Sequence, residues 1–161
     1  MTEQPSPLTH TDSIRIDAPP ATVWALVTAM DRYGEWSSEN TGGYWRKNAD
    51  GVPGTGEIGD KFVGRNARDG VEWKALVEVV ERDEQTAFAF VTGGMEYNVA
   101  MWRYSLQPDG DGTVLTEQWE LRKRDFFIEK GGQAELDQRA SNARESIAAT
   151  LQGMKAAAEA S

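Results

Sequence analysis

Cysteine is absent from the 161-residue sequence. Disulfide bonds, thiolate catalysis and cysteine-ligated zinc are therefore excluded, and the absence fits a reducing compartment, so we expect a cytoplasmic location. Histidine is nearly absent too, because only His10 occurs. It lies in a polar, proline-containing start, residues 1–11, which we expect to be a disordered tail. A Ser-His-Asp triad and a multi-histidine metal site are thus unavailable, and we predict no metal and no other cofactor.

Basic residues are also few. The sequence has 17 Lys and Arg residues against 26 Asp and Glu residues, which gives a formal net charge of −9. Phosphate contacts need a basic surface, so this balance disfavours a nucleic-acid partner. No apolar run reaches the roughly 20 residues of a membrane span, and the N-terminus lacks the layout of a signal peptide. We therefore expect no stable membrane insertion, and either a monomer or a homodimer.

The sequence does contain a repeated strand pattern. Hydrophobic residues make up 39% of the chain, enough for a single domain over 12–161 with a sizeable core. Short turns such as Arg68-Asp69-Gly70 join consecutive strands, so the sheet should be antiparallel. Alternation of apolar and polar residues predicts strands over 12–17, 44–47, 61–67, 72–82, 86–91, 97–107 and 113–122.

Three helices are expected around this sheet. Pro19 and Pro20 suit the first turn of a helix, and a second short helix is expected over about 30–36. The longest helix is predicted over about 133–158. A single apolar stripe along it would lie against the concave face of the sheet. That stripe contains Ala140, Ala143, Ile147, Leu151, Met154 and Ala158.

Short motifs occur along this order of elements: Ile14-Arg15-Ile16-Asp17-Ala18-Pro19, Tyr33-Gly34-Glu35-Trp36-Ser37, Gly59-Asp60-Lys61-Phe62, Trp102-Arg103-Tyr104 and Leu115-Thr116-Glu117. Together with the order of elements, they resemble the START-like helix-grip (SRPBCC) superfamily, in particular its bacterial polyketide cyclase/dehydrase-like branch. The match covers nearly everything after residue 11. It implies an α+β helix-grip fold, in which a curved antiparallel sheet of about six to seven strands wraps around the long C-terminal helix and encloses a cavity.

One motif suggests a nucleotide site but lacks the surroundings that such a site needs. Residues 54–59 read G-x-G-x-x-G, the dinucleotide-binding fingerprint. That fingerprint works only between a buried strand and the N-terminus of a helix, which holds the pyrophosphate. Here a turn-rich segment precedes the motif and a predicted strand follows it. We interpret it as a loop.

The last predicted strand places a carboxyl group on its inner face. Glu117 has the same parity as Leu115 and Trp119, and side chains alternate across a strand, so Glu117 should point into the cavity. A buried carboxylate must be paired, reach water or take a raised pKa, and such groups occur at catalytic sites. A structural ion pair or a strand twist toward solvent would also explain it. Asn66 and Tyr104 could complete a catalytic set with Glu117.

Aromatic residues supply the remaining candidates. Core packing explains many of them, but an aromatic-lined pocket would use the same inward positions. The Phe126-Phe127-Ile128 cluster precedes the predicted long helix, where it would form a lid or pack on that helix. The full set of expected ligand-binding residues is Trp36, Phe62, Trp73, Phe88, Phe90, Asn98, Trp102, Trp119, Phe126, Phe127, Ile147 and Leu151.

Three functions fit these observations. The first is a carrier or sensor that binds a small hydrophobic or aromatic molecule in an internal cavity. The second is a polyketide cyclase/dehydratase-like enzyme without metal, although the missing cavity histidine weakens it, because histidine titrates nearest pH 7. The third is a co-chaperone-like module whose groove receives a protein segment. A cavity with polar groups in its wall would favour the first two, and a filled core beneath a large exposed apolar patch would favour the third.

Overall fold

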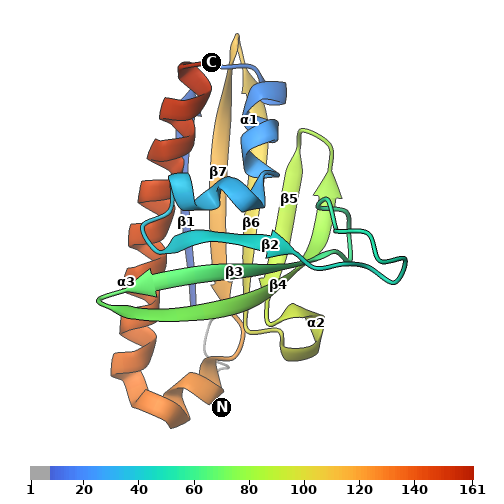
Figure 1. Ribbon diagram of the computed structural model, residues 1–161. Helices are drawn as coiled ribbons and strands as arrows, with labels where there is room; N and C mark the ends of the chain where they lie inside the picture. Colours follow the sequence, from blue (N-terminus) through green and yellow to red (C-terminus); the bar gives the residue numbers. More distant parts are fainter. Residues whose placement is uncertain (1–7) are drawn as a thin grey trace, which may run out of the picture.

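The computed structural model describes residues 8–161 and confirms an α+β helix-grip architecture (Figure 1). Seven strands form one antiparallel sheet, and the long C-terminal helix lies along it. In chain order the elements are β1 (Leu8–Ile16), α1 (Pro20–Val27), η1 (Met30–Glu35), β2 (Asn40–Trp45), β3 (Lys61–Arg68), β4 (Val71–Asp83), β5 (Ala87–Thr92), α2 (Gly94–Tyr97), β6 (Ala100–Asp109), β7 (Gly112–Leu121) and α3 (Arg124–Glu159).

The sheet is strongly curved. Its strand order is β1-β7-β6-β5-β4-β3-β2, so the meander from β2 to β7 is closed by β1 beside β7. The register shifts between Asn40 and Gly42 and between Val79 and Glu81, and such bulges bend a strand and increase its twist. As a result β2, β3 and β4 cross the direction of the other strands (Figure 1). One hydrophobic cluster joins the inner face of the sheet to α1, η1 and α3.

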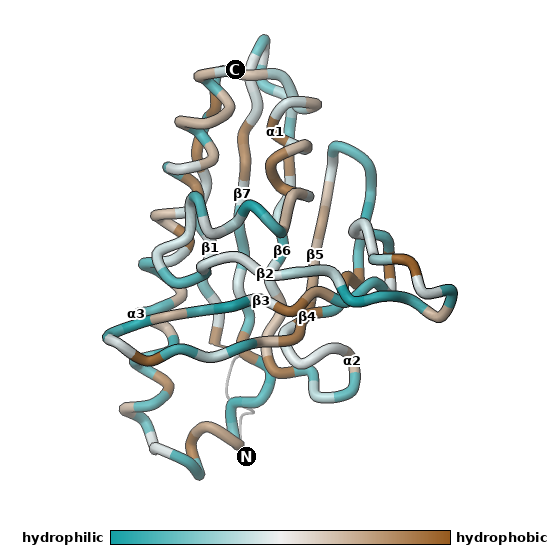
Figure 2. Tube along the Cα trace, in the orientation of Figure 1, coloured by the Kyte–Doolittle hydropathy of each residue, from teal (hydrophilic) through white to brown (hydrophobic). Residues whose placement is uncertain are grey.

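The turns follow the predicted chemistry. Asp69 and Gly70 both have positive φ, 52° and 81°, which is the conformation of a two-residue hairpin turn between β3 and β4. The segment between β2 and β3 projects from the body of the protein, and its tip is hydrophilic, whereas α1 is largely hydrophobic (Figure 2). None of the helices in residues 8–161 is long and apolar enough to cross a membrane.

The element α3 consists of two helical pieces that meet at a kink. The long second piece begins directly after Gly132, close to the predicted start at about residue 133, and a short first piece from Arg124 precedes it. Phe126-Phe127-Ile128 therefore lies in a helix and not in a loop. Gly132 interrupts α3 with φ 68° and ψ −159°, a region of backbone conformation that is essentially restricted to glycine. The sequence prediction missed the N-terminal piece because it ended the helical pattern at the Gly131-Gly132 pair.

Further boundaries differ from prediction. Strand β2 spans Asn40–Trp45 rather than 44–47. Strand β1 begins at Leu8, so residues 8–11 of the expected tail are strand, and His10 pairs in register with Trp119. Residues 1–7 of that tail lie outside the described residues. Strand β6 begins at Ala100 and not at Tyr97, because Gly93 and Gly94 take positive φ and start the short helix α2.

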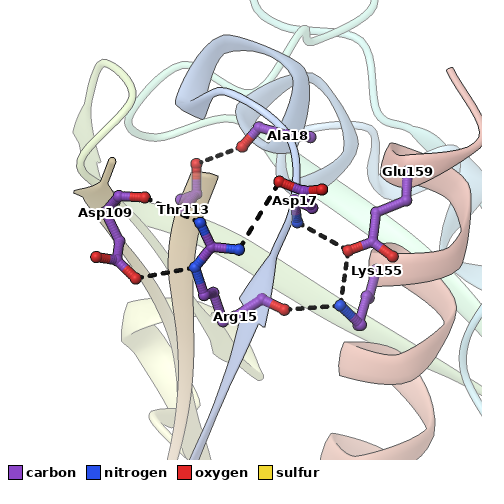
Figure 3. Close-up of polar contacts among 7 residues, drawn as sticks. All are labelled: Arg15, Asp17, Ala18, Asp109, Thr113, Lys155 and Glu159. Atoms are coloured by element: carbon purple, nitrogen blue, oxygen red, sulfur yellow. Dashed lines mark hydrogen bonds and ion pairs between the residues drawn. The ribbon is translucent and has the colours of Figure 1, made fainter. Parts of the chain in front are cut away.

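Polar contacts connect the C-terminal end of α3 with the end of β1 (Figure 3). Lys155 on α3 donates to the Arg15 carbonyl oxygen at 2.9 Å and to Glu159 at 2.6 Å, and Glu159 accepts from the Asp17 amide at 2.8 Å. Arg15 also pairs with Asp109 at 2.9 Å. These contacts fix the C-terminal end of α3 against the end of β1. The cavity described below is bordered by α3 residues that precede this end.

Candidate ligand cavity

A cavity of about 530 Å³ lies between the inner face of the sheet and α3. Its wall is mainly apolar and aromatic, with polar side chains concentrated on α3 and on the segment after η1. The sheet and Val99, which directly precedes β6, contribute part of the lining: Phe62, Gly64, Asn66, Trp73, Ala75, Val77, Phe90, Thr92, Val99, Ala100, Trp102, Tyr104, Glu117, Trp119 and Leu121. The helices, the segment after η1 and the first residue of β2 contribute the rest: Met30, Tyr33, Ser37, Glu39, Asn40, Glu135, Gln138, Arg139, Asn142, Ala143, Ser146 and Thr150.

Glu117 lies where strand alternation predicts. Its neighbours of equal parity, Leu115 and Trp119, are buried, and Glu117 itself is only 3% exposed while it lines the cavity. Its Oε1 atom is buried without a hydrogen-bond partner among the described residues. Burial disfavours the charged form and raises the pKa of the carboxyl group to about 8, and a hydrogen bond from Tyr104 opposes part of that rise.

Two tyrosines accompany this carboxyl group. Tyr104 on β6 is the register partner of Glu117, and its ring lies 6.1 Å from that of Tyr33 on η1. The hydroxyl of Tyr33 donates to the carbonyl oxygen of Val27. Burial raises the pKa of both phenols well above the usual range, and the Glu117 charge adds to that rise. Both phenols therefore stay protonated near neutral pH and act as hydrogen-bonding groups.

The rim of the cavity is charged and partly exposed. Arg139 on α3 pairs with Glu135 at 2.9 Å, and its guanidinium stacks 3.6 Å above the ring of Phe127. Trp73, near the β3–β4 turn, is 38% exposed although it lines the cavity. Asn66 faces it in register and also borders a smaller hollow beside the exposed strand β4, which places Asn66 at the rim.

One polar link crosses from the sheet to α3 beside this rim. Arg68, at the end of β3, pairs with Glu39 at 2.9 Å and reaches Glu145 on α3 at 3.4 Å. Glu39 lines the cavity, and so do Asn142 and Ser146, which flank Glu145 on α3. We call Arg68, Glu39 and Glu145 the rim link.

The structure brings together most of the expected site but not all of it. All three proposed catalytic residues, Glu117, Tyr104 and Asn66, line the cavity, as do Phe62, Trp73, Phe90, Trp102 and Trp119. Asn98 was wrongly placed on a strand face. It follows α2 with φ 46° and accepts a hydrogen bond from Arg122 at 2.9 Å, away from the cavity. The other expected ligand-binding residues outside the lining are Trp36, Phe88, Phe126, Phe127, Ile147 and Leu151.

These other residues pack elsewhere. Phe88 is fully buried edge-on to Trp24 of α1, and Trp36 lies against Gly153 of α3. Ile147 and Leu151 are core residues of α3.

The Phe126-Phe127-Ile128 cluster divides in the same way. Phe127 is buried beneath Arg139, whereas Phe126 is 56% exposed. Phe127 therefore packs beneath the rim of the cavity. That Phe126 and Phe127 form a lid stays a prediction.

Residues that sequence reasoning missed lie on α3 and η1. Arg139, Asn142, Ser146 and Thr150 are spaced by 3, 4 and 4 residues, beside the apolar stripe, and line the cavity. This second stripe is visible in the sequence, because a helical position one residue away is rotated by about 100°. Tyr33 carried no such signal, since nothing in the sequence shows that η1 folds over Tyr104.

The described residues offer no set of side chains suited to bind a metal ion. Within residues 8–161, His, Asp and Glu residues form no group of three that could hold an ion. His10, although ordered in β1, does not line the cavity.

Residues 7–159 match the family model described as polyketide cyclase / dehydrase and lipid transport. The chain belongs to this family. A solution NMR structure of the Polyketide_cyc-like protein Cgl2372 from Corynebacterium glutamicum is 32% identical over 94% of this chain and 91% of that chain, with a TM-score of 0.67. No curated protein matches this chain.

Two less similar structures share its fold. The di-domain ARO/CYC StfQ from the steffimycin biosynthetic pathway is 11% identical with a TM-score of 0.68, over 96% of this chain and 50% of that one. A START superfamily protein from Mycobacterium smegmatis is 16% identical with a TM-score of 0.54, over 87% of this chain and 98% of that one.

Proposed function

We propose that this family member binds a small hydrophobic or aromatic molecule in the cavity between the sheet and α3, as a carrier or sensor. The observation that carries the proposal is the cavity itself. Protein cores are close-packed, with few voids larger than a water molecule, whereas these aromatic side chains surround about 530 Å³. That volume lies within the range of roughly 300–1,000 Å³ typical of small-molecule sites. The family description, which includes lipid transport, supports the same function.

The wall suits a guest with an extended apolar body. Trp102 and Trp119 lie side by side with ring centroids 6.3 Å apart, and Phe90 on β5 and Phe62 on β3 also line the cavity. Such rings offer faces and edges for a planar or aliphatic guest. A cavity with polar groups in its wall also favours ligand binding over the co-chaperone-like hypothesis, which expects a filled core.

Filling the cavity tests this proposal. Ala75 lies between Trp73 and Val77 on the inner face of β4, so Ala75→Phe should occupy the space and weaken binding of the neutral fluorophore N-phenyl-1-naphthylamine at least tenfold. Ala67→Phe makes the same change on the outer face of β3 and should leave binding unaltered. Equal affinities of the two variants, measured by fluorescence titration, would contradict the proposal.

A second candidate function is a dehydratase- or cyclase-like reaction, and the buried carboxyl group favours it. A pKa of about 8 puts Glu117 within reach of proton exchange near neutral pH. For a β-hydroxy carbonyl guest, the ionised fraction of Glu117 would take the α-proton while Tyr104 donates a hydrogen bond to the carbonyl oxygen. Glu117 would then give that proton to the departing hydroxyl group, which leaves as water, and would return to its starting state. Asn66, at the rim, would orient the guest.

Glu117→Gln separates these functions, because it retains the shape and removes the charge. Retained binding with lost turnover would support the enzyme. Absence of turnover in both proteins, with fluorophore binding still present, would support the carrier. The assay follows the loss of a β-hydroxy ketone substrate and, separately, the displacement of the fluorophore.

A further inference from the structure

The charged groups in the cavity wall differ in whether they have an ion-pair partner. Arg139 is paired with Glu135 at 2.9 Å, and Glu39 is paired with Arg68 at 2.9 Å. Glu117 differs from both acids. No Lys, Arg or His forms an ion pair with it among the described residues, and its Oε1 atom makes no hydrogen bond there. The deepest acidic group of the cavity is thus the one left without a cation.

Every element that packs around Glu117 leaves this position without positive charge. Tyr104 comes from β6, Tyr33 from η1, and Thr150 is the buried polar residue of α3. On β1 the register partner of Glu117 is Asp12, an exposed second acid on the same face of the sheet. A negative neighbour cannot stabilise a carboxylate, so the partner must be a proton or a cation brought from outside.

We infer that the guest of this cavity carries a basic amine, whose ammonium group donates to Oε1 of Glu117 while its apolar body lies along the aromatic wall. The inference rests on the proposed ligand-binding function and names its ligand class. Phe90, Trp102 and Trp119 line the same cavity, and aromatic faces attract ammonium groups. The net charge of −9 also favours the approach of a cation.

Proton balance gives the inference a second signature. At pH 7 the free protein holds a proton on Glu117, and a free alkylamine is already an ammonium ion. Formation of the ion pair therefore releases the carboxyl proton to the buffer, one proton for each guest bound. A neutral guest would leave that proton in place. The affinity for an amine should accordingly rise between pH 6 and pH 8.

The test uses three probes with one apolar body: 2-(1-naphthyl)ethylamine, 2-(1-naphthyl)ethanol and 1-naphthaleneacetate. By isothermal titration at pH 8, the amine should bind at least tenfold more tightly than the alcohol, and the acetate more weakly than the alcohol. Glu117→Gln should remove the advantage of the amine and keep the affinity for the alcohol. Glu120→Gln makes the same change on the outer side of β7, where Glu120 pairs with Arg122, and should keep that advantage. Titration of the native protein in buffers of different ionisation enthalpy should show the released proton.

The possible results separate this inference from the proposed function. Equal binding of amine and alcohol, tighter binding of the acetate, or no proton release overturns the amine inference. So does failure of all three probes while N-phenyl-1-naphthylamine still binds. Failure of that neutral fluorophore as well overturns the proposed function itself.

Discussion

Glu117, Tyr104 and Tyr33 form a short line of hydrogen-bonding groups in the interior. Tyr33 donates to Val27, which leaves its oxygen free to accept from Tyr104, and Tyr104 can then accept from a protonated Glu117. Each hydroxyl group donates to the next only while the carboxyl group holds its proton. Ionisation of Glu117 reverses the Tyr104 hydroxyl toward the carboxylate. That hydrogen bond favours the ionised carboxylate, but burial outweighs it, so the pKa of Glu117 stays raised.

Replacing this acid should change the pH dependence of stability. Below about pH 4.3, which is the pKa of a glutamate in the unfolded chain, Glu117 holds its proton in both the folded and the unfolded state. Between that pH and about 8 only the folded state still holds it, so stability falls as pH rises through this window. Glu117→Gln removes that slope, and at pH 8.5 the variant should be more stable than the native protein by on the order of a few kcal/mol. Urea unfolding between pH 5 and pH 9 measures the difference.

Glu120→Gln serves as the comparison for this experiment, because Glu120 lies on the same strand, is one-third exposed and pairs with Arg122. Its unfolding free energy should follow that of the native protein across the whole range. A difference between Glu117→Gln and the native protein that does not change with pH would contradict the buried, protonated carboxyl group.

At the scale of elements, α3 packs on one side and borders the cavity on another. Its apolar stripe, which includes Ile147, Leu151 and Met154, is buried in the core. The adjacent polar stripe faces the cavity. This division requires a fixed rotation of the helix about its axis, and Gly153 helps to set it. A Cβ atom at Gly153 would lie only 2.7 Å from the Cβ of Trp36.

Gly153→Ala should therefore destabilise the protein despite the better helix propensity of alanine. Alanine improves on glycine by about 0.5–1 kcal/mol within a helix, but overpacking a tight contact costs about 1–3 kcal/mol. A lower unfolding midpoint is expected, together with weaker fluorophore binding if α3 shifts. Gln152→Ala, at the exposed neighbouring position, should leave both unchanged. A higher midpoint for Gly153→Ala would show that Trp36 yields readily.

Sequence patterns predicted these elements unevenly, for physical reasons. Alternation along β7 placed Glu117 correctly, because that strand is regular from end to end. The same reasoning failed at Asn98, since two glycines with positive φ interrupt the chain before β6. The helical stripe identified the core face of α3, yet periodicity does not reveal that Ile147 and Leu151 turn away from the cavity. That choice depends on where the β3–β4 hairpin crosses the helix.

At the scale of the whole molecule, the rim link joins two parts that otherwise flank the cavity. Arg68 connects the end of β3 to the segment after η1 and to α3. Exposed ion pairs contribute only about 0–1 kcal/mol to stability, but this one joins two sides of the cavity rim. Its expected effect is on exchange of the guest and not on folding.

Glu145→Gln should thus accelerate release of bound N-phenyl-1-naphthylamine by about two- to fivefold, which corresponds to the loss of one exposed ion pair. The melting temperature should change by no more than a degree or two. Stopped-flow dilution measures the rate, and Glu120→Gln controls for the loss of one negative charge. Identical release rates in the two variants would mean that the guest leaves by another path.

The pairing of β1 with β7 also determines when this fold can be completed. Ser13 and Thr116, whose hydroxyl groups lie 2.7 Å apart, are 103 positions apart in the chain. During synthesis from the N-terminus, β1 therefore waits unpaired until β7 and α3 have emerged, with the apolar side of Ile14 and Ile16 uncovered. Such long-range pairing slows folding, because the entropy of a large loop must be lost before its contacts form. The same long-range pairing leaves the nascent chain open to aggregation or to chaperone capture until its last helix is made.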